Sequence, residues 1–170
     1  MAQKGFHILV SAVEELRLRG LTAHVACFGW GGFIREEQAM LRSRELIDYF
    51  HFLPHTDDME SALRGVDLVA IPSRWEACPL LPMEALVAGA PVVTSDCIGM
   101  REVVANTPAI TFPSGNAHEL ADRIQLFHND PIQFRDRAKA FRTKAASRFC
   151  SGNSANALHS LYQSLLEDRT

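Results

Sequence analysis

Two glutamates stand eight residues apart in the apolar stretch 73–96, SRWEACPLLPMEALVAGAPVVTSD. Glu76 and Glu84 offer two acceptor oxygens each, which suits them to bind a vicinal diol such as that of a ribose or a sugar. A helix that begins beside them would add free N–H groups and a positive dipole end, which favour phosphate. These features predict a nucleotide-sugar site. The alternative is that Glu84 only strengthens a helix start and that Glu76 is a solvated loop residue.

Strand and helix signals alternate along the 170 residues. Strands are expected at 22–28, 49–53, 67–71, 91–94 and 109–112. Helices are expected at 6–19, 34–46, 57–64 with Asp57 as cap, 82–89, from 116 through Phe127, 131–149 and 153–167. Such alternation indicates βαβ units. We therefore expect one α/β domain: a Rossmann-like parallel sheet that runs through 22–28, 49–53, 67–71 and 91–94, helices on both faces and a helical C-terminal tail.

The two glutamates fall where this fold binds ligands. In open α/β sheets, ligands lie beyond the carboxyl ends of the strands. The strand at 67–71 ends at Pro72, and the next helix is expected to begin at Pro82, because proline resists a helix interior. This places Glu76 in the loop and Glu84 in the first turn of the helix, both facing the same crevice.

The stretch PSRWEACPLLPMEALVAGAPVVTSDCIGMREVV resembles the signature of the retaining, group 1 (family 4) glycosyltransferases of the GT-B fold. That signature has an E-x7-E motif, then EA-x-A-x-G-x-PVV and a G-x-x-E turn, which Gly99 and Glu102 match. Lys4 and the glycine after it resemble a KG segment of the family. The resemblance covers about residues 3–150. It implies the donor-binding half of an enzyme that moves a hexosyl unit from a nucleoside-diphosphate sugar to an acceptor hydroxyl.

The resemblance also implies roles for individual residues. Glu84 would bind the ribose hydroxyls, and Glu76, the candidate catalytic residue, would contact the hydroxyls of the donor sugar. Lys4 would balance the charge of the diphosphate, with an ordinary surface lysine as the alternative. No metal or other cofactor is implied.

Two further segments would complete the donor site. Main-chain groups of the loop would approach the sugar and the diphosphate, through Cys78, Pro79, Leu80 and Leu81. Phe52 and Leu53 would border the base. Many family members have Phe-Gly where this chain has Cys-Pro, which removes one N–H donor. A nucleophilic role for Cys78 is disfavoured, because no histidine is near it in the sequence.

The match begins late in the family pattern. The family places a strand that ends in Gly-Arg before the KG segment, and an acceptor-binding domain before that. We therefore expect an inactive donor-binding fragment or subunit that needs the N-terminal domain. An interrupted sheet would expose apolar surface and main-chain groups, which favours a homodimer. The alternative function is a catalytically silent nucleotide-binding or assembly module.

Composition excludes several other classes. A net charge of −3 gives no basic footprint for nucleic acid, and no apolar run reaches the length of a membrane span. The N-terminus is a poor signal peptide, and the four cysteines lack CxxC spacing, so a cytoplasmic location is expected. The basic run 134–148 suggests a solvated helix face, with peripheral attachment to the inner face of the membrane or to a partner as the alternative.

Overall fold

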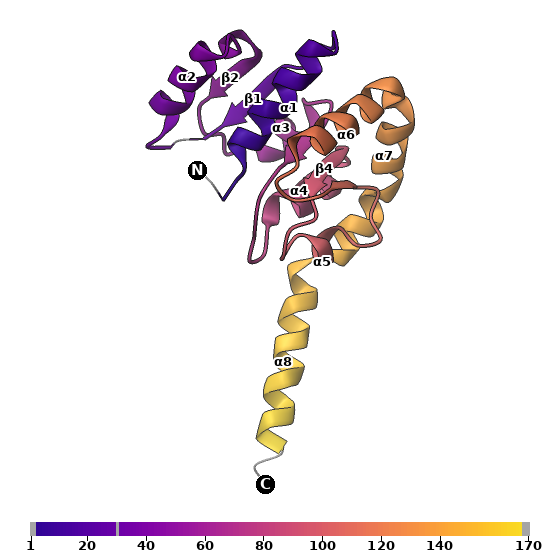
Figure 1. Cartoon of the computed structure of the whole chain (residues 1–170). Helices are drawn as coiled ribbons and strands as arrows, with labels where there is room; N and C mark the ends of the chain where they lie inside the picture. The colour runs from indigo at the N-terminus through magenta and orange to yellow at the C-terminus, as the bar shows by residue number, and fades with distance from the viewer. Residues whose placement is uncertain (1–2, 30, 168–170) are drawn as a thin grey trace.

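The computed structural model describes residues 3–29 and 31–167, which form parallel sheets flanked by helices (Figure 1). The strands are β1 (Val25–Phe28), β2 (Phe50–Leu53), β3 (Val69–Ile71), β4 (Val92–Ser95) and β5 (Ile110–Phe112). The α-helices are α1 (Phe6–Leu18), α2 (Ile34–Ser43), α3 (Met59–Arg64), α4 (Leu80–Ala88), α5 (Arg101–Val104), α6 (Ala117–Asn129), α7 (Pro131–Arg148) and α8 (Ser151–Glu167). A 3-10 turn at Ile47–Tyr49 leads into β2. The α/β class and the helical tail are as predicted.

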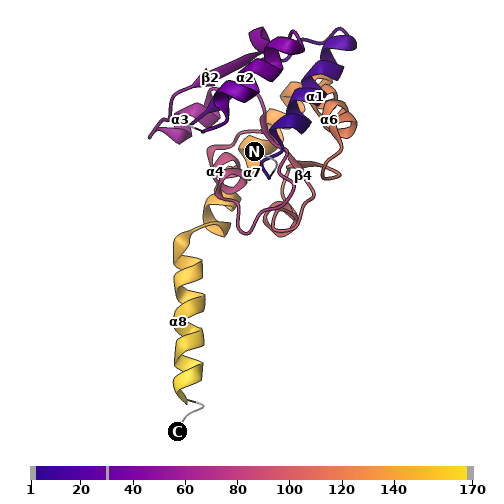
Figure 2. The same ribbon diagram turned by 60° about the vertical axis from the view of Figure 1, so that its left-hand side comes forward.

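All strand pairs are parallel, but the strands form two sheets. β1 pairs with β2, with Val25 opposite Phe50, while β4 lies between β3 and β5, with Val69 opposite Val92. The prediction of one sheet through 22–28, 49–53, 67–71 and 91–94 is therefore wrong, because β1 and β3 each keep one edge that pairs with no strand among the described residues. Figure 2 shows the β1–β2 sheet with α2 set apart from the layer that holds β4.

Helices cover both faces of the β3–β4–β5 sheet, as β4 shows most clearly. Its four residues are all buried, which explains the continuous apolar run in the sequence. Val93 packs in a core with α1 and α6, whereas Val92 packs in a second core with α4, α5 and α7. Successive side chains of a strand point to opposite faces, so these two valines mark the two layers.

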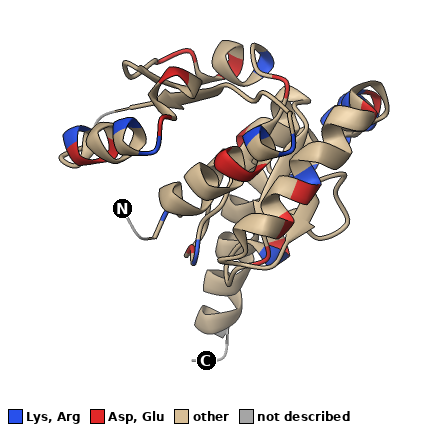
Figure 3. Cartoon of the chain, turned by 45° about the horizontal axis from the view of Figure 1, so that its top comes forward, with Lys and Arg blue, Asp and Glu red and all other residues tan. Residues whose placement is uncertain are grey.

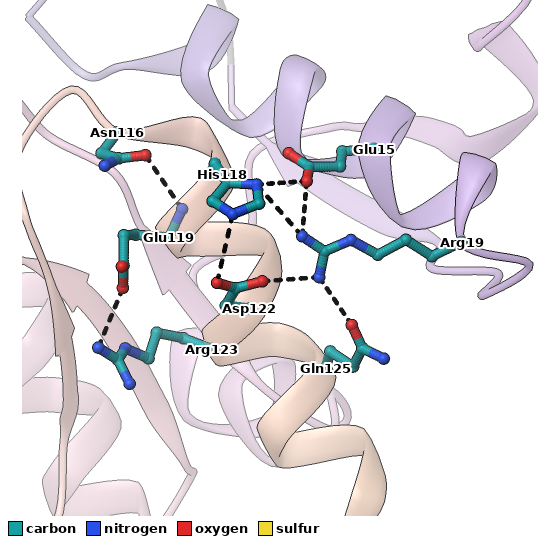
Figure 4. Close-up of polar contacts among 8 residues, drawn as sticks. All are labelled: Glu15, Arg19, Asn116, His118, Glu119, Asp122, Arg123 and Gln125. Atoms are coloured by element: carbon teal, nitrogen blue, oxygen red, sulfur yellow. Dashed lines mark hydrogen bonds and ion pairs between the residues drawn. The ribbon is translucent and has the colours of Figure 1, made fainter.

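A polar network fastens α1 to α6 (Figure 4). Arg19 donates to Glu15 at 2.5 Å and to Gln125 at 2.7 Å, and it forms an ion pair with Asp122 at 2.7 Å. His118 Nδ1 lies 2.5 Å from the same Glu15 carboxylate. The hydrogen bond from Arg19 lowers the pKa of Glu15, and His118 adds to this against the opposing effect of burial. These contacts join residues about one hundred positions apart and fix the position of α1.

Helix α8 projects away from the rest of the fold (Figures 1 and 2). Every side chain described in it is exposed, including the expected stripe of Leu158, Leu161 and Leu165. Residues 151–166 contain no Lys, Arg, Asp or Glu, whereas residues of both charges are dispersed over the rest of the fold (Figure 3). The stripe was therefore predicted correctly as a pattern, but it covers no core.

Several helix starts differ from those expected. Asn116 and Pro131 begin α6 and α7 as predicted, and the Asn116 side chain accepts from the Glu119 N–H at 3.1 Å. The cap of α3 is Asp58 rather than Asp57, since it is the Asp58 carboxylate that accepts from the Ser61 N–H. The prediction of Asp57 relied on its capping-box spacing to Glu60, and the structure places the cap one residue later.

Candidate functional site

The loop that follows β3 carries Glu76 and is fixed by its own backbone. The Glu76 N–H donates to the carbonyl of Ile98 at 3.1 Å, which ties the loop to the turn after β4. Gly99 in that turn has a φ of +81°, and a Cβ there would lie 1.9 Å from the Glu76 carbonyl oxygen. Only glycine allows this approach. The glycine of the G-x-x-E turn therefore supports the first glutamate of the E-x7-E motif.

The carboxylate of Glu76 is buried and paired. Its Oε1 accepts from Lys4 Nζ and from Ser73 Oγ, both at 2.7 Å. The Glu76 side chain is only 8% exposed, whereas that of Lys4 is 59% exposed. Burial raises the pKa of Glu76, but the bonds from Lys4 and Ser73 outweigh it, so the pKa lies below its ordinary value. The alternative of a solvated loop carboxylate is therefore wrong.

Three residues with buried hydroxyl groups lie just after β3 or at the end of β4. Ser73, Thr94 and Ser95 are each at most 1% exposed. Ser95 Oγ donates to the backbone carbonyl of Ser73, and Thr94 Oγ1 donates to that of Ile71 at 3.2 Å. Our sequence reasoning missed all three residues. The available signal was the appearance of polar residues at the ends of two apolar strands.

Helix α4 begins at Leu80, two residues before the predicted start. Pro79 is the N-cap, and no side chain caps the helix. Pro82 is the third helical residue, a position where the missing N–H would have no partner within the helix. The prolines therefore did not delay the helix. The backbone N–H groups of Leu80 and Leu81 therefore lie in the first turn of the helix, and Leu80 follows Glu76 by four residues.

Glu84 lies in a different environment from Glu76. It is the fifth residue of α4, beyond the first turn in which it was expected, and it is exposed. Among the described residues, no hydrogen bond or ion pair joins it to Glu76 or Lys4. The effect of the helix dipole fades within the first turn. The earlier helix start therefore weakens the purely structural explanation of Glu84.

The remaining predicted residues lie at two places near the start of α1. Cys78 is exposed before α4, its N-cap Pro79 is buried, and Leu80 and Leu81 at the start of the helix are exposed. Phe52, near the end of β2, lies with its ring centroid 6.2 Å from that of Phe6. The exposed Leu53 accepts from the Gly29 N–H at 3.2 Å through its carbonyl.

The start of α1 connects these two places. Gly5 has a φ of +68°, and a Cβ there would lie 1.9 Å from the carbonyl oxygen of Pro72, which follows β3. The next residue, Phe6, packs against both Phe50 and Phe52 of β2. Lys4 precedes this junction and reaches Glu76. The segment 4–6 therefore brings the ends of β2 and β3 to one site.

A hollow of about 650 Å³ lies at the opposite edge, where the chain enters β3 and β4. Two of its basic side chains have structural partners: Arg135 binds Asp67, and Arg142 Nε donates to the Val87 carbonyl at 3.2 Å at the end of α4. Cations near a helix C-terminus stabilise the helix. These contacts give Arg135 and Arg142 of the basic run a structural role. The hollow lies away from the carboxyl ends of the strands, so it is not the candidate site.

Two other kinds of site find no support among residues 3–29 and 31–167. No group of three or more His, Cys, Asp or Glu side chains there could hold a metal ion. No helix in these ranges has both the length and the apolar character to cross a membrane. The four cysteines are free, and burial raises the pKa of Cys27 to about 11, with a further rise from Glu37.

Comparison with known proteins identifies the family of this chain. A family model described as "Glycosyl transferases group 1" matches residues 1–130. Glycogen synthase of Mycobacterium tuberculosis is 29% identical over 165 residues, which cover 94% of this chain and 39% of that protein. The chain thus spans about two fifths of the length of this relative.

Solved structures show the same fold. Anabaena HepE in complex with UDP superimposes with a TM-score of 0.84 at 23% identity, over 96% of this chain and 46% of that one. Sucrose-phosphate synthase of Thermosynechococcus elongatus gives a TM-score of 0.85 at 22% identity, over 98% of this chain and 43% of that one. The fold assignment as one half of a GT-B protein is therefore confirmed.

Proposed function

This chain belongs to the group 1 glycosyltransferases, and we propose that it is the donor-binding part of an enzyme that transfers a glycosyl unit from a nucleoside-diphosphate sugar. In the complete enzyme, the unit passes to an acceptor hydroxyl with retention of configuration at the anomeric carbon. The acceptor is held by the part of the enzyme that corresponds to the unmatched length of the relatives.

The observation that carries this proposal is the ion pair of the buried Glu76 carboxylate with the exposed Lys4, beyond the end of β3. Burying a carboxylate is costly unless it is paired and hydrogen-bonded, so its burial beside a ligand-binding edge suggests a role beyond solubility. The uncapped start of α4 follows directly, and its N–H groups suit a phosphate. One carboxylate, one ammonium and one helix start match the sugar and diphosphate of a donor.

Each part of the donor then has an assigned partner. Glu76 accepts from hydroxyls of the transferred sugar, and Lys4 exchanges part of its contact with Glu76 for the diphosphate. The N–H groups of Leu80 and Leu81 share the charge of the leaving diphosphate. Glu84 binds the ribose hydroxyls, and Phe52 and Leu53 border the base. HepE binds UDP and UDP-glucose, which favours a uridine nucleotide as the first donor to test.

Calorimetric titration of the 170-residue chain tests the proposal. We expect UDP, GDP or ADP to bind, with one base preferred, and the matching sugar nucleotide to bind with additional heat. The chain alone should transfer no sugar, because catalysis requires both reactants to be held together. Absence of binding to every nucleotide in the panel would exclude a donor site. Binding without transfer, even after the complementary domain is added, would favour the silent binding module.

A further inference from the structure

Among the described residues, the one side-chain partner of the Ser73 hydroxyl is the carboxylate of Glu76. Ser73 is 1% exposed, and its Oγ donates to Glu76 Oε1 at 2.7 Å. Burying a hydroxyl costs free energy that a hydrogen bond only offsets, and alanine would avoid this cost. The hydroxyl therefore adds to the stability of the fold only through the buried carboxylate of Glu76, which it helps to satisfy.

The backbone of Ser73 is itself held by the rigid strand β4. Ser95, the last residue of β4, donates from its hydroxyl to the Ser73 carbonyl. Both residues are fully buried. A chain of contacts thus runs from the sheet through Ser73 to the carboxylate, and side chains that are locked in this way can hold a functional group in one orientation.

Lys4 and Ser73 share the same carboxylate oxygen but differ in mobility. Both donate to Oε1, and neither binds Oε2. Lys4 is well exposed on a flexible stem, so it can move toward a diphosphate, whereas Ser73 cannot move. When Lys4 turns to the diphosphate, the Ser73 bond stays on Glu76.

We propose that Ser73 is a positioning residue that holds Oε1 of Glu76 and thereby presents Oε2 to a hydroxyl of the donor sugar. This inference rests on the proposed function, since it assigns the sugar to Glu76. Ser73 then contributes to the recognition of the sugar but not to the affinity for the nucleotide.

The test compares Ser73→Ala with Thr94→Val, a matched variant that also loses a buried hydroxyl. Within the part of the chain that the structure describes, the Thr94 hydroxyl donates to backbone carbonyls and has no hydrogen bond to Glu76. For each variant and the parent, calorimetry gives the affinities for UDP and UDP-glucose. Carbon-detected NMR titration of the Glu76 carboxyl, without ligand, gives its pKa.

For Ser73→Ala we expect about a tenfold loss of affinity for UDP-glucose with UDP unchanged, as for one lost bond to a charged group. The pKa of Glu76 should rise, because a bond to its charged form is lost. In Thr94→Val, both the ratio of the two affinities and the pKa should stay at parental values.

The outcomes separate the two proposals. A parent that binds neither UDP nor UDP-glucose contradicts a uridine donor site, and the inference falls with it. A parent that binds both, together with a Ser73→Ala variant that keeps the parental ratio and the parental Glu76 pKa, leaves the donor site intact and overturns the positioning role. Equal changes in Ser73→Ala and Thr94→Val also overturn it, since they would reflect only a disturbed core.

Discussion

Glu76 and Glu84 belong to one sequence motif, yet the fold treats them differently. Glu76 is buried in a pair with Lys4, whereas Glu84 is exposed beyond the first turn of α4. A buried carboxylate that is held by two donors keeps one orientation, while an exposed one is free to meet a mobile ligand. This difference makes separate roles for the two glutamates testable.

Substituting the two glutamates by glutamine should separate nucleotide binding from sugar binding. Glu84→Gln replaces a carboxylate oxygen by an amide donor, so we expect UDP to bind about ten- to a hundredfold more weakly. Glu76→Gln should leave UDP binding nearly unchanged and weaken UDP-glucose. Calorimetric titration of both variants with both ligands measures this. Equal affinities in all four titrations would contradict the assigned roles.

The depressed pKa of Glu76 predicts a pH dependence of stability. A carboxyl group with a lowered pKa in the folded chain contributes stability above its unfolded pKa of about 4.3, and this contribution is lost as the pH falls through the folded value. The gap in unfolding free energy between the parent and Glu76→Gln should therefore narrow as the pH is lowered below about 4.3. Urea unfolding at a series of pH values measures the gap. A gap that does not change with pH would count against the charged pair.

At the scale of elements, the turn after β4 matters because it carries the loop of the site. The Gly99 turn and the loop after β3 meet through backbone atoms, so neither can move alone. The buried hydroxyl of Ser95 in β4 also holds this loop, because it donates to the Ser73 carbonyl. The end of β4 therefore sets the position of Glu76, although β4 supplies no residue that was predicted to bind the donor.

Gly99→Ala should displace the Glu76 loop. The added Cβ would meet the Glu76 carbonyl and would also strain a positive φ, so we expect a loss of about 2–4 kcal/mol in unfolding free energy and weaker UDP-glucose binding. Gly115→Ala is the matched control, because its φ is +87° and nothing lies within 4 Å of the added Cβ. It should cost only about 1 kcal/mol. Similar losses in both variants, by chemical denaturation, would refute the contact.

At the scale of the whole molecule, the compact α/β layers contrast with the isolated helix α8. The sheets are fastened by α1 and by its network with α6, whereas α8 exposes Leu158, Leu161 and Leu165. These three side chains are 49%, 53% and 53% exposed and lie on one helical face. Exposed apolar stripes of this kind favour association.

Leu161→Glu should reduce self-association of the purified chain. We expect the parent to form larger species as its concentration rises, because the α8 stripe leaves water on contact. A charge in the stripe opposes that contact, whereas Gln163→Glu adds the same charge on the opposite face and should have little effect. Sedimentation velocity over a hundredfold range of concentration measures this. A parent that stays monomeric throughout would show that the stripe does not associate.

The sequence alone determined the features that depend on near neighbours. The alternation of apolar runs predicted the five strands and the α/β class, and local signals at Asn116 and Pro131 predicted two helix starts. The spacing of Glu76 and Glu84 marked the motif, because spacing is written in the chain. These features follow from the periodicity of side chains and from caps within three or four residues.

Only the tertiary structure decided the features that depend on distant contacts. The sequence placed Lys4 and Glu76 in different roles, 72 positions apart, and the fold joined them in one ion pair. It also placed Ser73 under the carboxylate, split the strands into two sheets and left α8 uncovered. Pairing of strand edges and burial of an amphipathic face depend on which elements come together, and a pattern that favours burial does not name the partner that covers it.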